Sequence, residues 1–227
     1  MNPRPAGDGF GLHLVTDERV PFARLLEVVD AAASAGVDVV QVRAKSASGR
    51  EFLRQARAVA DAVAGRALVL VNDRVDVALA ARDAGARIDG VHLGQSDLPP
   101  TTARRLLGAH TVVGWTANTP AHLDAASAFP AGTLDYLGVG VIRPTSTKPN
   151  HPPVLGVEGF AGLAARTALP CIAIGGVVDG DVVALRDAGA AGVAVVSAIC
   201  AADDPGAATR AFRTAAAFAT PGAVAAR

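Results

Sequence analysis

The sequence has no net charge, very few cysteines and lysines, and no long apolar segment. Its 21 basic and 21 acidic residues are mixed along the chain, so no basic patch is available to bind a phosphate backbone and we expect no nucleic-acid partner. No run reaches the roughly 18 apolar residues of a membrane span, and residues 1–11 lack the apolar stretch of a secretory signal. We therefore expect neither membrane insertion nor export.

Cysteine occurs only at Cys171 and Cys200, which lie in apolar segments far apart in the sequence. This spacing gives no indication of a metal site and is typical of free thiols in a reducing compartment. We therefore expect a cytoplasmic protein. The sequence leaves its oligomeric state open, a homo-oligomer included.

Lysine occurs at only two positions, Lys45 and Lys148, and all the other basic residues are arginines. Two interpretations stay open. In the first, the two lysines are survivors of a compositional bias towards arginine. In the second, they stand where a compact ammonium group is needed and a planar guanidinium group would not fit.

Short apolar runs recur along the chain, beginning at residues 12, 37, 67, 90, 111, 134, 170 and 192. Stretches with helical spacing separate them, such as 22–36 and 50–65, which close with glycine. Apolar rather than alternating strands predict a parallel sheet covered by helices, and this number of units predicts a (β/α)₈ TIM barrel of the α/β class. A doubly wound open sheet is the alternative, but no glycine-rich fingerprint follows the first run.

We find no linker, no low-complexity segment and no second domain. A chain of 227 residues with 51% hydrophobic content can bury one large core. The prediction is a single domain, 1–227, with its core at about 12–218 and loose ends at 1–10 and 220–227.

Polar side chains follow the predicted strands, where the chemistry of such barrels is located. Gln41, Arg43 and Lys45 alternate with valines, and side chains two apart on a strand share a face, so these three would point into the barrel mouth. With Asn72 and Lys148 on the same rim they would form a cationic site for a polyphosphate. The other interpretation is that Arg43 and Lys45 only bind acidic residues at the rim.

Two carboxylates follow neighbouring strands, Asp73 after the third and Asp97 after the fourth. Beside a phosphate site they suit Mg²⁺, which takes one or two carboxylates together with water and phosphate oxygens. Alternatively, each caps the helix that follows it. His92 is the only histidine expected on this rim, and a structural role is expected for it.

A second anion site is expected after the last two strands. Gly175 and Gly176 follow the seventh strand and Val196 and Ser197 the eighth, where such barrels often bind phosphate through backbone N–H groups. Two anion sites on one rim suggest two phosphorylated substrates.

The segments QVRAK, VNDRVD, GVHLGQSDL, PTSTK, AIGGV and VAVVSAI stand in the order and spacing of the thiamine-phosphate synthase family, which the chain resembles from about Leu12 to Pro205. The resemblance implies a transferase that joins a pyrimidine methyl diphosphate to a thiazole ethyl phosphate and releases pyrophosphate, in thiamine biosynthesis.

The resemblance also implies roles for individual residues. The pyrimidine diphosphate would be bound by Gln41, Arg43, Lys45, Asn72, Thr116 and Lys148. The thiazole phosphate would be bound by Thr145, Thr147, Gly176, Val196 and Ser197. Asp73 and Asp97 would bind Mg²⁺, and Lys45, Lys148 and Arg43 would neutralise the departing diphosphate.

The chain departs from the family pattern at three positions. Thr116 stands where serine is usual, Val141 replaces a usual proline and Arg143 a usual phenylalanine, so the last two bear on the loop at the thiazole side. Two other functions stay as alternatives: a thiazole phosphate isomerase of the same fold, and a non-catalytic sensor of thiamine-related phosphates. The isomerase would leave both lysines and both aspartates without a role, and the sensor would need no leaving-group apparatus.

Overall fold

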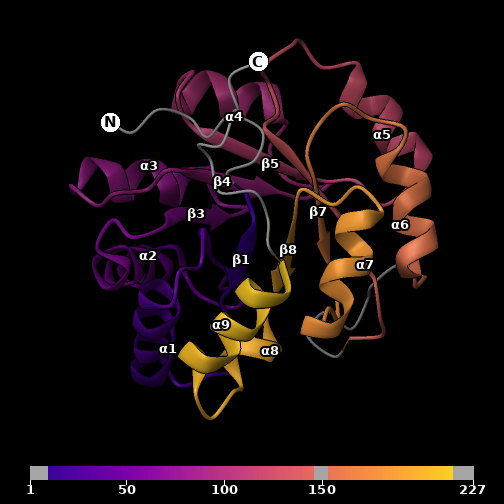
Figure 1. Cartoon of the computed structure of the whole chain (residues 1–227). Helices are drawn as coiled ribbons and strands as arrows, with labels where there is room; N and C mark the ends of the chain where they lie inside the picture. Colours follow the sequence, from indigo (N-terminus) through magenta and orange to yellow (C-terminus); the bar gives the residue numbers. More distant parts are fainter. Residues whose placement is uncertain (1–9, 146–152, 217–227) are drawn as a thin grey trace, which may run out of the picture.

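The computed structural model describes residues 10–145 and 153–216, in which eight parallel strands close into a barrel surrounded by helices. Each strand pairs with the next in the chain, and β8 closes the barrel on β1 with Leu12 opposite Val193. Figure 1 shows the helices around the strands in chain order. The predicted (β/α)₈ barrel is confirmed.

Each predicted apolar run contains one strand. The strands are β1 Leu12–Val15, β2 Val39–Val42, β3 Leu68–Asn72, β4 Gly90–Leu93, β5 Val112–Thr116, β6 Tyr136–Gly140, β7 Cys171–Ile174 and β8 Gly192–Val195. The helices are α1 Phe22–Ser34, α2 Gly49–Val63, α3 Val75–Asp83, α4 Pro100–Leu107, α5 Pro120–Ser127, α6 Gly156–Ala164, α7 Val182–Asp187, α8 Ser197–Cys200 and α9 Pro205–Ala216, with a 3₁₀ turn, η1, at Asp179–Asp181.

Helix α2 shows how local sequence sets the helix boundaries. The Ser48 side chain accepts a hydrogen bond from the Glu51 N–H and caps the first turn, as serine commonly does. The helix closes at Ala64 and Gly65, both with positive φ, which leaves the helical path. A predicted stretch of helical spacing thus becomes a helix with defined ends.

The strands separate two hydrophobic regions. Val40 and Val42 pack outwards in the larger cluster, between barrel and helices. Val39, Leu70 and Ile172 belong to the smaller cluster inside the barrel. Inward and outward side chains therefore alternate along β2. Gln41 is buried on the inner side and lines the mouth of the barrel, as predicted.

The largest side chain in the barrel interior is that of Tyr136, which is 1% exposed. Its ring lies 5.0 Å from that of Phe10 and 5.3 Å from that of His13, between centroids. Gly114 makes room for it, because a Cβ atom there would lie 2.2 Å from the Tyr136 ring. At this level of the barrel the space is therefore occupied by one large side chain, with a glycine opposite it.

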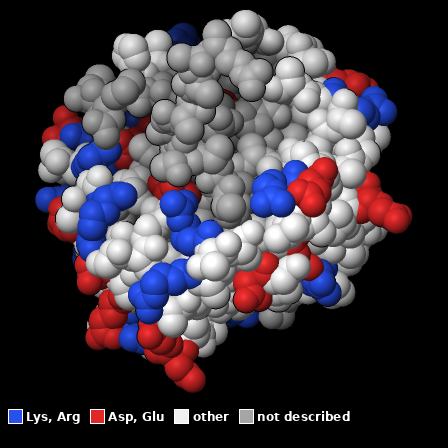
Figure 2. Space-filling view, viewed as in Figure 1, with Lys and Arg blue, Asp and Glu red and all other residues white. Residues whose placement is uncertain are grey.

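No helix in the described part of the chain is long and apolar enough to cross a membrane. On the face in Figure 2, positive and negative side chains lie mixed rather than gathered by sign. Treating all of 1–227 as one domain stays a prediction, because both ends lie outside the described residues.

Gly114→Ala should destabilise the barrel strongly. The new methyl group would overlap the Tyr136 ring, and overpacking of this kind costs about 1–3 kcal/mol or more. Gly162→Ala is the control: it lies inside α6 with no atom within 4 Å of a new Cβ, and we expect a gain of about 0.5–1 kcal/mol. Chemical denaturation of the two variants measures both changes. Equal stability of the two would contradict this packing.

Candidate active site

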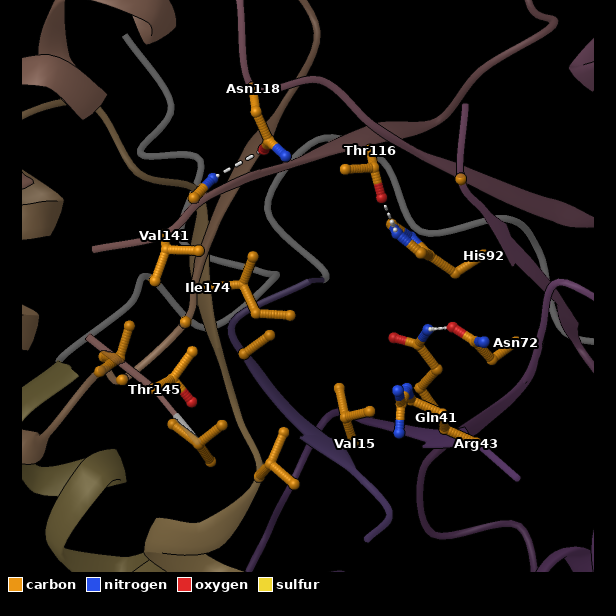
Figure 3. Close-up of a pocket in the computed structure, with 18 of the residues that line it drawn as sticks. Val15, Gln41, Arg43, Asn72, His92, Thr116, Asn118, Val141, Thr145 and Ile174 are labelled. Carbon is orange, nitrogen blue, oxygen red and sulfur yellow. Dashed lines mark hydrogen bonds between the residues drawn. The ribbon is translucent and has the colours of Figure 1, made fainter. Parts of the chain in front are cut away.

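A cavity of about 430 Å³ opens at the carboxyl ends of the strands. All eight strands contribute to its wall, and Figure 3 shows its side chains converging. Of the predicted site residues, it is lined by Gln41, Arg43, Lys45, Asn72, Asp73, Asp97, Thr116, Thr145, Gly176, Val196 and Ser197. Thr147 and Lys148 lie outside the described residues.

Two buried amides form one pair in the wall of the cavity. The Gln41 Nε2 group donates to Asn72 Oδ1 at 2.7 Å, from the neighbouring strands β2 and β3 (Figure 3). This bond leaves a carbonyl oxygen on Gln41 and N–H groups on Asn72 for a ligand. Such a pair can hydrogen-bond to a flat heterocycle that carries both a donor and an acceptor.

The two predicted metal ligands lie together, and neither caps a helix. Helix α3 is preceded by Arg74 and α4 by Pro99, without a side-chain cap in either case. Asp97 instead turns back to accept the Gly94 N–H at 2.6 Å. Asp73 has a φ of 64°, which is uncommon outside glycine and often occurs at functional sites. The helix-cap interpretation is therefore wrong for both.

The carboxylates of Asp73 and Asp97 are in contact. Burial, followed by the neighbouring Asp73 carboxyl group, raises the pKa of Asp97 above its ordinary value. Two adjoining carboxylates that resist ionising together suit a cation between them. No group of three or more His, Cys, Asp or Glu side chains suited to a metal occurs in the described residues.

The cations of β2 and its loop have acidic partners in this structure. Lys45 forms an ion pair with Asp73, and Arg43 lies 3.7 Å from a Glu18 oxygen. The interpretation that both cations bind acidic residues at the rim thus agrees with these contacts. Yet the partner of Lys45 is itself a predicted metal ligand, and both residues line the cavity.

The opposite side of the cavity is built around glycine. Gly175 and Gly176 have φ of 94° and 70°, and a Cβ on Gly176 would lie 2.8 Å from Arg143 Cβ. Only glycine allows the loop after β6 to pack this closely on the loop after β7. Thr145, Val196 and Ser197 line the same side, where a phosphate was predicted.

Arg143, which replaces the usual phenylalanine of the family pattern, ties these two loops together. Its Nε donates to Asp181 Oδ2 at 2.8 Å and its second guanidinium nitrogen to Oδ1 at 2.5 Å. Asp181 is buried and also accepts the Val178 N–H at 3.1 Å. The charge therefore points away from the cavity and anchors the loop at its outer side.

Among the polar residues that line the cavity, the sequence assigned no role to Asn118 and only a structural role to His92. Asn118 accepts the Gly140 N–H at 3.0 Å, between the ends of β5 and β6. His92 bonds through both ring nitrogens, to Tyr136 and Thr116. The position of Asn118 two residues after Thr116 was the available signal, because period two places both on the inner face.

A family model described as thiamine monophosphate synthase matches residues 12–199. The chain belongs to the thiamine monophosphate synthase family. It is 43% identical to the thiamine-phosphate synthase of Azorhizobium caulinodans over 89% of this chain and 93% of that protein. It is 46% identical to that of Albidiferax ferrireducens over 86% of each.

Solved structures agree with this family assignment. Thiamine phosphate pyrophosphorylase from Pyrococcus furiosus superposes with a TM-score of 0.78 at 30% identity, over 92% of this chain and 96% of that one. A 3-hexulose-6-phosphate synthase superposes with a TM-score of 0.68 at 21% identity, over 91% and 100%, which shows the shared barrel alone. The expected resemblance to the thiamine-phosphate synthase family is confirmed.

Arg143→Gln should destabilise the protein in a pH-dependent way. The hydrogen bonds from Arg143 lower the pKa of Asp181 below its ordinary 3.8, so the ionised carboxylate stabilises the folded state above that value. This contribution is lost as the pH falls through the lowered folded-state pKa. We expect a lower melting temperature than wild type at pH 5–7, and a difference that shrinks as the pH falls below about 4 towards the lowered folded-state pKa.

Arg186→Gln is the matched control, because the partly exposed Arg186 pairs with the exposed Asp187 at the surface, and such pairs contribute little. If Arg143→Gln lowered the melting temperature equally at every pH, or did not lower it at all, then Arg143 would not be what lowers the pKa of Asp181.

Proposed function

We propose that the protein is a thiamine-phosphate synthase, a transferase that joins 4-amino-2-methyl-5-(diphosphooxymethyl)pyrimidine to 4-methyl-5-(2-phosphoethyl)thiazole and releases pyrophosphate. The observation that carries this proposal is one cavity with three kinds of wall. It has an amide pair for a heterocycle, a carboxylate pair beside Lys45 for a metal-bound diphosphate, and a glycine-lined loop for a second phosphate.

The reaction needs one bond to break and one to form. The carbon–oxygen bond between the pyrimidine methylene and the diphosphate breaks, and the diphosphate takes the electron pair. The thiazole nitrogen lone pair then forms the new bond to that carbon. The aminopyrimidine ring is electron-rich and can carry positive charge on its methylene, so a dissociative order is favoured. No proton transfer is required.

The side chains would therefore act by position and charge. Gln41 and Asn72 would orient the pyrimidine at the end of the cavity where β2 and β3 lie. Arg43 and Lys45, with Lys148, would neutralise the charge that develops on the departing diphosphate. Thr116 would contact the same substrate from β5.

The thiazole side would be bound by the opposite loops. Thr145 and Thr147, with Gly176, Val196 and Ser197, would hold its phosphate. This would direct the thiazole nitrogen towards the pyrimidine methylene across the cavity. Two phosphates bound at opposite walls would set the distance between the reacting atoms.

Asp73 and Asp97 would hold Mg²⁺, which would help to neutralise the negative charge of the leaving diphosphate. Lys45 would then exchange its contact with Asp73 for one with the substrate. The cytoplasmic location stays a prediction, as does the possibility of a homo-oligomer.

The two alternatives use less of the site. A thiazole phosphate isomerase needs the phosphate site and an acid–base residue, which leaves the carboxylate pair and Lys45 without a role. A sensor needs affinity alone. The test is to incubate both substrates with purified protein and Mg²⁺ and to measure thiamine phosphate and pyrophosphate. We expect equimolar products that require Mg²⁺, and folded protein that forms neither product would contradict the proposal.

Asp73→Asn and Asp97→Asn should each lower turnover by on the order of 10²-fold or more, while the free energy of unfolding changes by less than about 0.5 kcal/mol. Asparagine keeps the shape and tolerates positive φ, so only the charge is lost. Helix caps lost to alanine would cost about 0.5–2 kcal/mol instead. Asp61→Asn, exposed on α2, is the control. Normal turnover with Mg²⁺ in both site variants would refute the metal assignment.

Lys45→Arg should fold normally and lose on the order of 10²-fold in turnover. Arginine keeps the charge but moves it by about an ångström, and misplacement on that scale is costly. Lys148→Arg is expected to behave alike. Arg50→Lys makes the opposite exchange at an exposed position at the start of α2. It serves as the control and should keep wild-type turnover. Wild-type turnover in both lysine variants would mean that these lysines are survivors of compositional bias.

A further inference from the structure

Three side chains form a polar chain from the barrel interior to the cavity. The Tyr136 hydroxyl lies 2.9 Å from His92 Nδ1, and His92 Nε2 lies 3.0 Å from Thr116 Oγ1. Tyr136 is 1% exposed and His92 is 9% exposed, while Thr116 and His92 both line the cavity, as Figure 3 shows. A buried hydroxyl is therefore linked through one imidazole to a hydroxyl that faces the ligand.

Packing fixes the imidazole in this chain. The rings of His92 and Tyr136 stack with centroids 5.4 Å apart. Gly138 stands against the other side, where an added Cβ would lie 3.0 Å from His92 Cε1. The ring keeps both hydrogen bonds because it has little room to turn.

The direction of each hydrogen bond follows from the tyrosine. No partner other than His92 contacts the Tyr136 hydroxyl in the described part of the chain, and burial raises the pKa of this hydroxyl, so its proton stays in place. If His92 Nδ1 carried a proton, the Tyr136 O–H would be buried without an acceptor, a costly state. The tyrosine therefore donates to Nδ1, and Nε2 carries the N–H of the neutral imidazole.

It follows that His92 donates to the Thr116 oxygen. The Thr116 oxygen thus accepts from the protein, and its own proton is left for the cavity. The opposite arrangement would have Thr116 donate to the histidine and offer the cavity only lone pairs. The direction of the hydrogen bond between His92 and Thr116 is therefore set by Tyr136, although this residue lies in the core.

We propose that Tyr136 and His92 are positioning residues that make Thr116 a hydrogen-bond donor to the substrate. Resting on the proposed function, this assigns to Thr116 an acceptor atom of the pyrimidine diphosphate, either a ring nitrogen or a diphosphate oxygen. The Thr116 proton would thus be directed at this acceptor atom, which restricts how the pyrimidine lies in the cavity.

The first test measures the tautomer directly in the protein without substrate. Nitrogen-15 NMR of histidine-labelled protein, with the His92 signals assigned from a His92→Asn variant, should show Nδ1 unprotonated and Nε2 protonated. A protonated Nδ1 would overturn the proposal. The NMR result does not depend on turnover, so it tests the His92 tautomer even if the protein does not catalyse the proposed reaction.

The second test is a double-mutant cycle on turnover. Thr116→Val removes the donor and should lower kcat/KM on the order of 10²-fold. Tyr136→Phe keeps the ring but removes the hydroxyl that fixes the His92 proton on Nε2. We expect this variant to lose less kcat/KM than Thr116→Val does. Because the tyrosine acts through Thr116, the double variant should be no worse than Thr116→Val alone.

Ile172→Val supplies the matched core control, since Ile172 belongs to the same inner cluster but lies outside the polar chain. Its effect should add to that of Thr116→Val. Additive losses for Tyr136→Phe as well would mean that the tyrosine only fills the barrel, and would overturn its positioning role. Wild-type protein without turnover would instead count against the proposed function.

Discussion

Closure of eight short parallel strands is the constraint on which the rest of the structure depends. It places the carboxyl end of every strand on one rim, and the two-residue period of a strand then decides which side chains face inwards. Gln41, Asn72 and Thr116 meet in one cavity for this reason alone. The same closure leaves limited space inside, which Tyr136 fills because Gly114 stands opposite.

The rim combines opposite charges. Lys45 contacts Asp73, and Asp73 adjoins Asp97. In the proposed reaction, a divalent cation would offset the repulsion between the two carboxylates, and a diphosphate would replace Asp73 as the partner of Lys45. We therefore propose that binding of each would favour binding of the other.

Local patterns predicted the strands, the rim and most of the polar side chains of the cavity, because alternation and chain order are enough once a barrel is assumed. They could not predict contacts set by the stagger between strands. The bonds of His92 with Tyr136 and Thr116 join three strands. Arg143 meets Asp181 from a different loop. The helix caps were wrong because Asp97 bonds back to Gly94, a turn that propensity alone does not reveal.

Calorimetric titration of the wild-type protein with inorganic pyrophosphate, with and without Mg²⁺, examines this charge arrangement most directly. The account predicts that Mg²⁺ tightens pyrophosphate binding by about tenfold or more, and that pyrophosphate tightens Mg²⁺ binding by the same factor, because coupling is reciprocal. Pyrophosphate affinity that is unchanged by Mg²⁺ would contradict it.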